Sequence, residues 1–249
     1  MSRSLSSGAH SRDPLAYPGY VLASADRRDL KNGVSNVPKP EVIGSSRSTY
    51  TRVVLMVCEE KGIEYTLRET AIFAPELFKV HPLGKMPALR HGDVCLFESK
   101  AIATYLDRTF EGPEIFPCES LPASLTEQWV SFVNTAVDRT FIRTYLYEYI
   151  AARRGNREPD RNVIEQVLPD LHRQIAILDT AVKTTGFLVS DRFTFADINL
   201  MPILHRLAQA PEGKDALARA VHLSKYEQHA QRSSFQRTRP PEGPPSRTK

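Results

Sequence analysis

The sequence predicts a chain in two parts, a small α/β unit followed by an all-helical unit. In residues 41–110, strand and helix patterns alternate in the order strand, helix, strand, helix, strand, strand, helix. Residues 111–122 contain three prolines and a glycine, which is typical of a linker. Beyond the linker, no strand pattern follows. Long stretches with apolar residues at helical spacing take its place, and they predict the all-helical unit.

The first unit begins with a strand at residues 41–44 and a helix at residues 48–62, in which Gly62 takes the position just past the helix end. Residues 65–70 alternate like a second strand, and residues 75–80 form a short, weak helix pattern. Because a strand–helix–strand start favours a right-handed crossover, the first two strands are predicted to be parallel.

Residues 81–103, HPLGKMPALRHGDVCLFESKAIA, predict a hairpin followed at once by a helix. Pro87 stands where the first hairpin strand begins, a position that tolerates proline because no N–H is needed there. A polar turn at Arg90 to Asp93 leads to the second strand, Val94 to Phe97. The helix then covers residues 99–110 and closes the α/β unit.

The second unit contains four stretches that we interpret as amphipathic or buried helices, residues 123–153, 160–183, 194–210 and 214–230. The third begins with a capping-box spacing between Thr194 and Asp197. Phe193 and Ile198 occupy the two positions of a hydrophobic staple around it. This pattern indicates a helix start and implies no chemistry.

The chain's net charge of +4 is concentrated at its two ends. Residues 1–40 carry six basic and three acidic side chains, and residues 231–249 carry five basic side chains and one acidic side chain. The net charge of residues 41–230 is therefore −3. This distribution argues against a nucleic-acid partner. We expect a disordered leader at residues 1–38 and a disordered tail at 239–249, and the prolines of the last nineteen residues predict no packed element there.

Several classes of protein are excluded by composition. No apolar run approaches eighteen residues, so no membrane-spanning helix is predicted. The three cysteines form neither a disulfide framework nor a metal motif, which favours a reducing, cytoplasmic compartment. Cys58 and Cys95 are predicted to be core residues, and Cys118 in the linker the more oxidisable thiol. The seven histidines are scattered, so no metal site and no cofactor are expected.

Four segments in this order resemble the glutathione S-transferase family: STYTRV with EEKGI (residues 48–53 and 59–63), GKMPAL (84–89), FESKAI (97–102) and the capping box at 194–198. The resemblance extends over about residues 41–241. It implies a thioredoxin-like domain at residues 39–117 and a helical domain at residues 118–238. It also implies that glutathione is a substrate.

The resemblance assigns roles to residues of the hairpin region. In the family the bond before Pro87 is cis, which turns the backbone of Met86 towards the cysteinyl part of glutathione, where the peptide pairs like an added strand. Ser99, at a helix start, would bind the carboxylate of the γ-glutamyl group, and Glu98 its ammonium. The alternative is that Glu98 and Ser99 serve only as an N-cap region.

One family contact is missing from the sequence. Members related to the plant serine classes often hold the glycyl carboxylate with a His-Lys pair, but Ile72 and Phe73 stand at those positions here. We take Lys85 as the candidate for that contact. His81, in place of the usual asparagine, is expected to shape its turn rather than to bind glutathione.

The family's serine members activate the thiol of glutathione with a hydroxyl at the start of the first helix, and Ser48 stands there. A hydroxyl that donates to sulfur favours the thiolate, as does the field of a helix N-terminus. Ser48 could instead be a simple N-cap. Tyr50 would serve if the strand ended later, and Ser45 or Ser46 if it ended sooner.

Together these observations predict a serine-type glutathione transferase that conjugates hydrophobic electrophiles and forms a homodimer. The alternatives are a glutathione-dependent peroxidase, isomerase or dehalogenase on the same fold, or a non-catalytic binding module. The aromatic side chains of the second unit leave two interpretations open, a pocket for the electrophile or a helical core with a dimer contact; they are Trp129, Phe132, Phe141 and Tyr145.

Overall fold

The computed structural model describes residues 38–241. Four strands form one mixed sheet in the order β2-β1-β3-β4: β1 (Glu41–Gly44), β2 (Thr66–Glu69), β3 (Ala88–His91) and β4 (Val94–Phe97). β1 pairs parallel with β2 and antiparallel with β3, and β3 pairs antiparallel with β4. The predicted parallel pairing of the first two strands and the predicted hairpin of β3 and β4 are therefore confirmed. Residues 1–37 of the leader expected at 1–38, and residues 242–249 of the tail expected at 239–249, lie outside the described residues.

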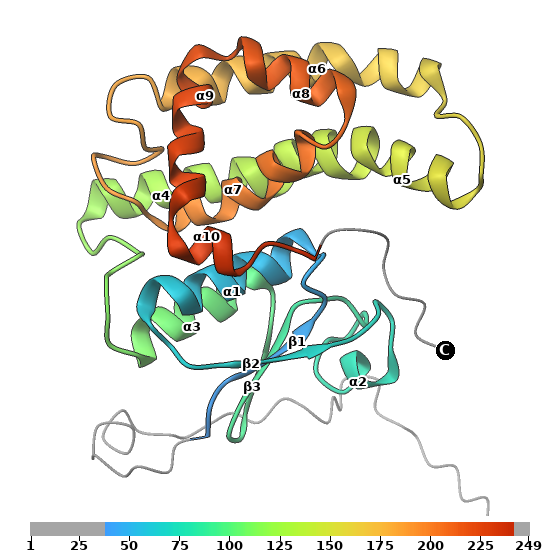
Figure 1. The fold of residues 1–249 in the computed structure, drawn as a ribbon. Coiled ribbons are helices and arrows are strands. Elements are labelled where there is room, and N and C mark those ends of the chain that lie inside the picture. Colours follow the sequence, from blue (N-terminus) through green and yellow to red (C-terminus); the bar gives the residue numbers. More distant parts are fainter. Residues whose placement is uncertain (1–37, 242–249) are drawn as a thin grey trace, which may run out of the picture.

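Helices cover both faces of this sheet because side chains of a strand point alternately to opposite faces. Val42 belongs to the large core beneath α1 (Thr49–Lys61) and α3 (Ser99–Thr109). Its neighbour Ile43 points the other way and packs with Leu77 of the short helix α2 (Pro75–Phe78). In Figure 1, α1 and α3 accordingly lie between the sheet and the helical half of the chain.

The helical half lies on the side of α1 and α3 that faces away from the sheet (Figure 1). α4 (Ser120–Phe132), the π-helix η1 (Val133–Leu146) and α5 (Tyr147–Arg154) follow one another without a break, so the first predicted helix is real but begins earlier and changes its winding. The next two predicted helices are α6 (Arg161–Ala181) and α7 (Phe195–Leu207).

The prediction of one helix over residues 214–230 is wrong. The segment forms α8 (Pro211–Arg219), α9 (Val221–Tyr226) and the 3-10 helix η2 (Glu227–Gln231). The break falls at Ala220, whose extended backbone, with ψ at 94°, ends α8 and also serves as the N-cap of α9. Because no glycine or proline marks this break, the apolar spacing predicted one continuous helix.

The end of the described chain is also packed, contrary to the expectation drawn from its prolines. α10 (Ser233–Arg237) follows η2 and lies against α1. Phe235 of α10 is only 3% exposed. Burial of a phenylalanine side chain contributes about 1.5–3 kcal/mol, which is sufficient to hold a one-turn helix in place.

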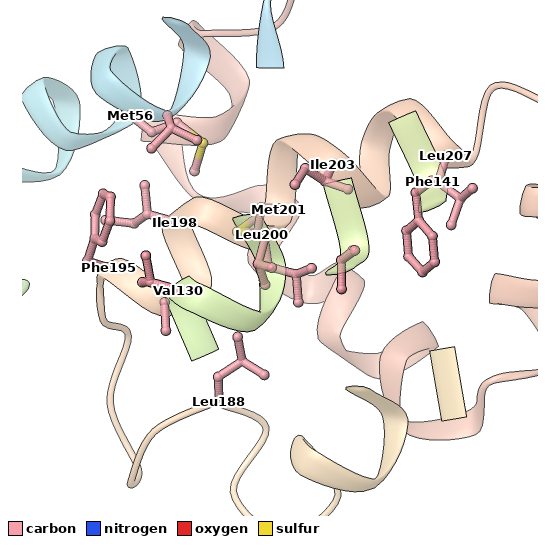
Figure 2. Close-up of a cluster of buried hydrophobic side chains, with 14 of the residues drawn as sticks. Met56, Val130, Phe141, Leu188, Phe195, Ile198, Leu200, Met201, Ile203 and Leu207 are labelled. Carbon is pink, nitrogen blue, oxygen red and sulfur yellow. The ribbon is translucent and has the colours of Figure 1, made fainter. Parts of the chain in front are cut away.

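α7 is the centre of the main core. Figure 2 shows Phe195 and Ile198 of α7 close to Met56 of α1 and to Val130 of α4, so α7 joins the two halves of the chain. The predicted capping box at its start is present, with the Asp197 carboxylate accepting the backbone N–H of Thr194 at 2.9 Å. In the described part of the chain, no helix has the length and apolar character needed to cross a membrane.

Candidate functional site

Three loops meet at one edge of the sheet. In the register of β1, β3 and β4, Ile43 pairs with Ala88 and Ala88 pairs with Phe97. Because β3 runs antiparallel to both β1 and β4, Pro87 just before β3 lies beside Gly44 at the end of β1 and beside Glu98 just after β4. The sheet thus brings the predicted site segments together in one row.

The segment after β1 touches the proline segment directly. The backbone N–H of Ser45 points to the sulfur of Met86 at 3.3 Å. A Cβ on Gly44 would lie 2.5 Å from Oγ1 of Thr51 and 3.3 Å from Cβ of Met86. Only glycine therefore allows β1, α1 and the proline segment to approach so closely.

The Met86–Pro87 peptide bond is cis, as the family resemblance implied. Met86 belongs to no helix or strand. Among residues 38–241, its backbone N–H and C=O have no backbone hydrogen-bond partner. This backbone position consequently keeps a donor and an acceptor for an extended peptide.

Glu98 and Ser99 form the turn into α3. Glu98 has a φ of 68°, a left-handed conformation that is uncommon for a residue with a side chain, and its carboxylate is 71% exposed. Ser99 is buried at the first position of α3. A strained residue with an exposed carboxylate beside a helix start is typical of a ligand site.

His81 lies under this turn. Its Nδ1 accepts the backbone N–H of Leu83 at 3.0 Å, so it shapes its own loop as the sequence indicated. Its Nε2 is 3.8 Å from the Glu98 carboxylate. Burial lowers the pKa of His81, and the charge of nearby Lys85 acts in the same direction. Lys85 itself is exposed, as are Ile72 and Phe73 at the positions of the missing His-Lys pair.

Ser48 is the N-cap of α1. Its Oγ accepts the backbone N–H of Thr51 at 3.3 Å, and its own backbone is extended. The N-cap interpretation is therefore satisfied, but accepting this bond uses only a lone pair and leaves the hydroxyl proton for another acceptor. Of the competing hydroxyls, Ser45 accepts the N–H of Arg47 through Oγ at 3.3 Å.

Tyr50 points to the helical half of the chain. Burial, followed by the negative charge of Asp138 on η1, raises the pKa of the Tyr50 phenol. Arg143 donates from Nε to Oδ2 of Asp138 at 2.9 Å, while Oδ1 of Asp138 is buried with no partner among the described residues. Asp138 of η1 therefore lies near Tyr50 at the start of α1, and π-helical segments are frequent at functional sites.

Asp138 and Arg143 were missed by the sequence reasoning. Their approach to Tyr50 depends on the π-helical winding of η1, and no propensity or spacing in residues 133–146 indicates such winding. A polar aspartate inside an otherwise apolar helix face was the one available signal.

The aromatic residues of the helical half divide between the two open interpretations. Phe141 and Tyr145 are 0% exposed and belong to the core, with the Tyr145 hydroxyl 2.9 Å from the Glu212 carboxylate. Trp129 packs edge-on against Phe132 and lines a shallow surface depression beside α6. These contacts favour a structural role for Phe141 and Tyr145.

The cysteines of the chain are free thiols. Burial raises the pKa of Cys58 to about 12, so this thiol is inert at neutral pH. Cys118 is exposed, but its hydrogen bond to Glu114 and the charge of that carboxylate raise its pKa as well. Within residues 38–241, no three His, Cys, Asp or Glu side chains gather as a metal site would require.

Comparison with known families finds two matching models. Residues 42–114 match the model described as the N-terminal domain of glutathione S-transferase, and residues 123–232 match the C-terminal domain of the same family. The two matches together extend over most of the described chain and contain all the candidate site residues.

Individual relatives agree with the family models. "Glutathione S-transferase 1" of Triticum aestivum is 28% identical over 187 residues, which is 70% of this chain and 82% of that protein. "Elongation factor 1-gamma" of Rattus norvegicus is 33% identical over 128 residues, 51% of this chain and 27% of that protein. A glutathione S-transferase structure from Methylobacillus flagellatus with glutathione bound is 25% identical, with a TM-score of 0.67 over 81% of this chain and 100% of that one.

Proposed function

The chain belongs to the glutathione S-transferase family, and from that premise we propose that it is a transferase that conjugates glutathione to hydrophobic electrophiles. The observation that carries the proposal is the single row formed by Gly44, Pro87 and Glu98 at one edge of the sheet. It gives an extended tripeptide a backbone partner at Met86 and a carboxylate at Glu98 to receive its ammonium.

In the proposed reaction, the thiolate of glutathione attacks an electrophilic carbon. A C–S bond forms, and the leaving group departs with the electron pair of the broken bond. Ser48, at the N-terminus of α1, would donate its hydroxyl proton to the sulfur as a hydrogen bond. Such a bond, together with the field of the helix end, favours the thiolate over the thiol. Lys85 remains the candidate for the glycyl carboxylate.

Thiolate formation alone accounts for little of the rate. Lowering a thiol pKa from about 8.5 to about 6.5 raises the thiolate fraction at pH 7 about 25-fold. Over the same two units, intrinsic nucleophilicity falls about eightfold, which leaves a net gain of about threefold. The larger contribution must come from holding thiolate and electrophile together, so the residues that bind the electrophile matter at least as much as Ser48.

Calorimetry on the full chain tests the glutathione site. We expect heat of binding at millimolar glutathione, and we expect the affinity to fall when Glu98 is replaced by Ala. Glu127→Ala is the matched control, because Glu127 is also an exposed carboxylate but lies on α4. Absence of binding by the folded protein would contradict the proposal. A panel of electrophiles and hydroperoxides then separates a transferase from a peroxidase on the same fold.

A second candidate function is a non-catalytic binding module. It is supported by the similarity to a protein named as an elongation factor rather than as a transferase, and by the absence of the His-Lys pair at Ile72 and Phe73. Binding of glutathione without turnover of any electrophile would favour this candidate.

The family assignment also supports a homodimer, which light scattering tests. The free thiols support the cytoplasm as the location of the protein, which cell fractionation tests.

A further inference from the structure

Arg52 is a buried cation without an acidic partner. The residue is 2% exposed, and its guanidinium lies between α1 and α10. Nη1 is 3.1 Å from Nδ1 of His205, and Nη2 donates to the backbone carbonyl of Phe235 at 3.0 Å. Nε is buried with no hydrogen-bond partner in the described part of the chain. Both of its partners are neutral acceptors, so the charge itself is not balanced.

Other arginines surround this point. The Arg52 guanidinium lies 4.0 Å from the centre of the Phe235 ring, and the Arg239 guanidinium lies 5.7 Å from the same centre. Arg206 follows His205 at the C-terminal end of α7, and Arg47 immediately precedes the N-cap of α1. We call Arg47, Arg52, Arg206 and Arg239 the arginine cluster.

The charges of the cluster act on one another. Burial, followed by the charges of Arg239 and Arg206, lowers the pKa of Arg52 to about 10. Burial, followed by the charge of Arg47, lowers the pKa of Arg206. His205 is kept neutral in the same way, because burial and then the nearby arginines lower its pKa to about 4. The charged groups that lower these three pKa values are all arginines.

No carboxylate balances the cluster within residues 38–241, where no ion pair within 4.0 Å involves any of its four arginines. Arginine side chains are almost never fully buried unless they are paired, because desolvation of an unpaired charge costs several kcal/mol. An oxyanion between them would offset this cost with charge-assisted hydrogen bonds.

The cluster adjoins the proposed thiolate. Arg47 is the residue before Ser48, and Arg52 lies one turn of α1 after it. We propose that the arginine cluster binds an anionic group, such as a carboxylate or sulfonate, on the electrophile that receives glutathione. This inference rests on the proposed transferase function and narrows it, because the acceptor would be an amphipathic anion rather than a wholly apolar molecule.

A pair of matched acceptors tests the proposal by turnover. 4-Chloro-3,5-dinitrobenzoate and 4-chloro-3,5-dinitrobenzamide are nearly the same size and react in the same way: the sulfur bonds to the ring carbon, and chloride leaves with the electrons of the C–Cl bond. With rates corrected for the uncatalysed reaction, we expect kcat/KM to favour the benzoate by about tenfold or more, as for a charge-assisted contact. Equal values for the two acceptors would overturn the proposal.

Variants of the cluster sharpen the test. Arg52 is left intact because its loss would disturb the fold. Arg206→Gln and Arg239→Gln should each reduce the benzoate-to-benzamide ratio about threefold, and the double variant should nearly abolish the preference. Arg219→Gln is the control, since Arg219 is an exposed arginine at the end of α8. A preference that survives the double variant, or that falls equally in the control, contradicts the assignment.

A binding measurement separates this proposal from the proposed function. 3,5-Dinitrobenzoate and 3,5-dinitrobenzamide lack the leaving group, so calorimetry on the full chain detects the site without any thiol chemistry. We expect the benzoate to bind about tenfold more tightly, and we expect the Arg206→Gln/Arg239→Gln double variant to lose the difference. If this preference holds but neither chlorinated acceptor is turned over, the anion site stands and the transferase function fails. If turnover occurs without the binding preference, the transferase function stands and the anion site fails.

Discussion

Arg232 donates two hydrogen bonds to Glu60, from Nε to Oε1 at 2.8 Å and from Nη2 to Oε2 at 2.6 Å. The hydroxyl of Ser234 also donates to Oε1 of Glu60. Glu60 lies in the last turn of α1, and Arg232 stands between η2 and α10. This bidentate pair therefore fixes the C-terminal segment on the α/β half of the chain, over a separation of 172 residues.

Arg232→Gln should destabilise the protein. The variant leaves the carboxylate of Glu60, which is 11% exposed, without its charged partner. Because the Arg232 side chain itself is partly exposed, we expect a loss of about 2 kcal/mol in the free energy of unfolding, or about 4–8 °C in Tm. Arg237→Gln is the control, since Arg237 is an exposed partner of Glu59 and should cost under about 0.5 kcal/mol. Equal losses in the two variants would show that the pair does not anchor the segment.

The effect of Arg232→Gln should depend on pH. Burial alone would raise the pKa of Glu60, but its hydrogen bonds with Arg232 and Ser234 outweigh burial and hold the pKa below the ordinary value of 4.5. A carboxyl with a lowered folded-state pKa stabilises the fold above its unfolded pKa and loses that contribution as pH falls through the folded value. The difference in unfolding free energy between wild type and variant should thus be constant near pH 7 and shrink below about pH 4.5. Denaturant titrations at pH 7, 5 and 4 measure it.

Gly44→Ala should disturb the candidate site. The new Cβ would meet Oγ1 of Thr51 at 2.5 Å and Cβ of Met86 at 3.3 Å, so α1 or the proline segment must move. We expect a loss of about 1–3 kcal/mol in stability and a weaker affinity for glutathione by calorimetry. Thr51→Ala in the same chain removes the closest contacts and should restore part of both.

Gly62→Ala is the control for Gly44→Ala. Gly62 has a φ of 67°, but a Cβ there would meet nothing within 4 Å. It should cost about 1 kcal/mol through backbone strain and leave glutathione affinity unchanged. If Gly44→Ala behaves like this control, close approach of α1 to Met86 is not required for binding.

The features that the sequence predicted depend on local chemistry. The capping box of α7, the N-cap at Ser48 and the αL C-cap at Gly62 each involve residues within one turn of helix. The hairpin was also predicted, but its turn is shorter than expected, because β3 continues through His91 and Gly92 adopts a positive φ of 58°. Strand ends are poorly marked when polar residues such as Arg90 and His91 continue the ladder.

The features that the sequence did not predict depend on residues far apart along the chain. Glu60 and Arg232 each look like an ordinary surface charge until the fold brings them together. The hydrogen bonds of Asp197 show the same difference. Its capping bond to Thr194 was predicted because the two residues are three apart, whereas the bonds that it accepts from the N–H of Leu188 and the hydroxyl of Tyr226 depend on the fold. The break at Ala220 and the winding of η1 likewise follow from packing, which overrides propensity.

Ser48→Ala should raise the pKa of the thiol of bound glutathione. It removes one hydrogen bond to a charged sulfur, an effect of about 1.5–3 kcal/mol, which corresponds to about one to two pKa units. Affinity for glutathione should change far less, because the contacts proposed for Met86, Glu98 and Ser99 are retained. Conjugation should slow at neutral pH and recover in part as pH rises. Thiolate absorbance of the complex, titrated against pH, measures the shift directly.

Ser48 is also the N-cap of α1, so Ser48→Ala alone cannot separate the two roles. Ser48→Asp separates them, because a carboxylate still accepts the N–H of Thr51 but has no proton to donate to sulfur. Both variants should raise the thiol pKa, whereas only Ser48→Ala should lose about 1 kcal/mol of stability.

Tyr50→Phe should leave the titration unchanged, since the Tyr50 hydroxyl faces the negative charge of Asp138 rather than a free site. Titrations that coincide for wild type and both Ser48 variants would reduce Ser48 to a helix cap, and a shift in Tyr50→Phe would transfer the thiol-activating role to Tyr50.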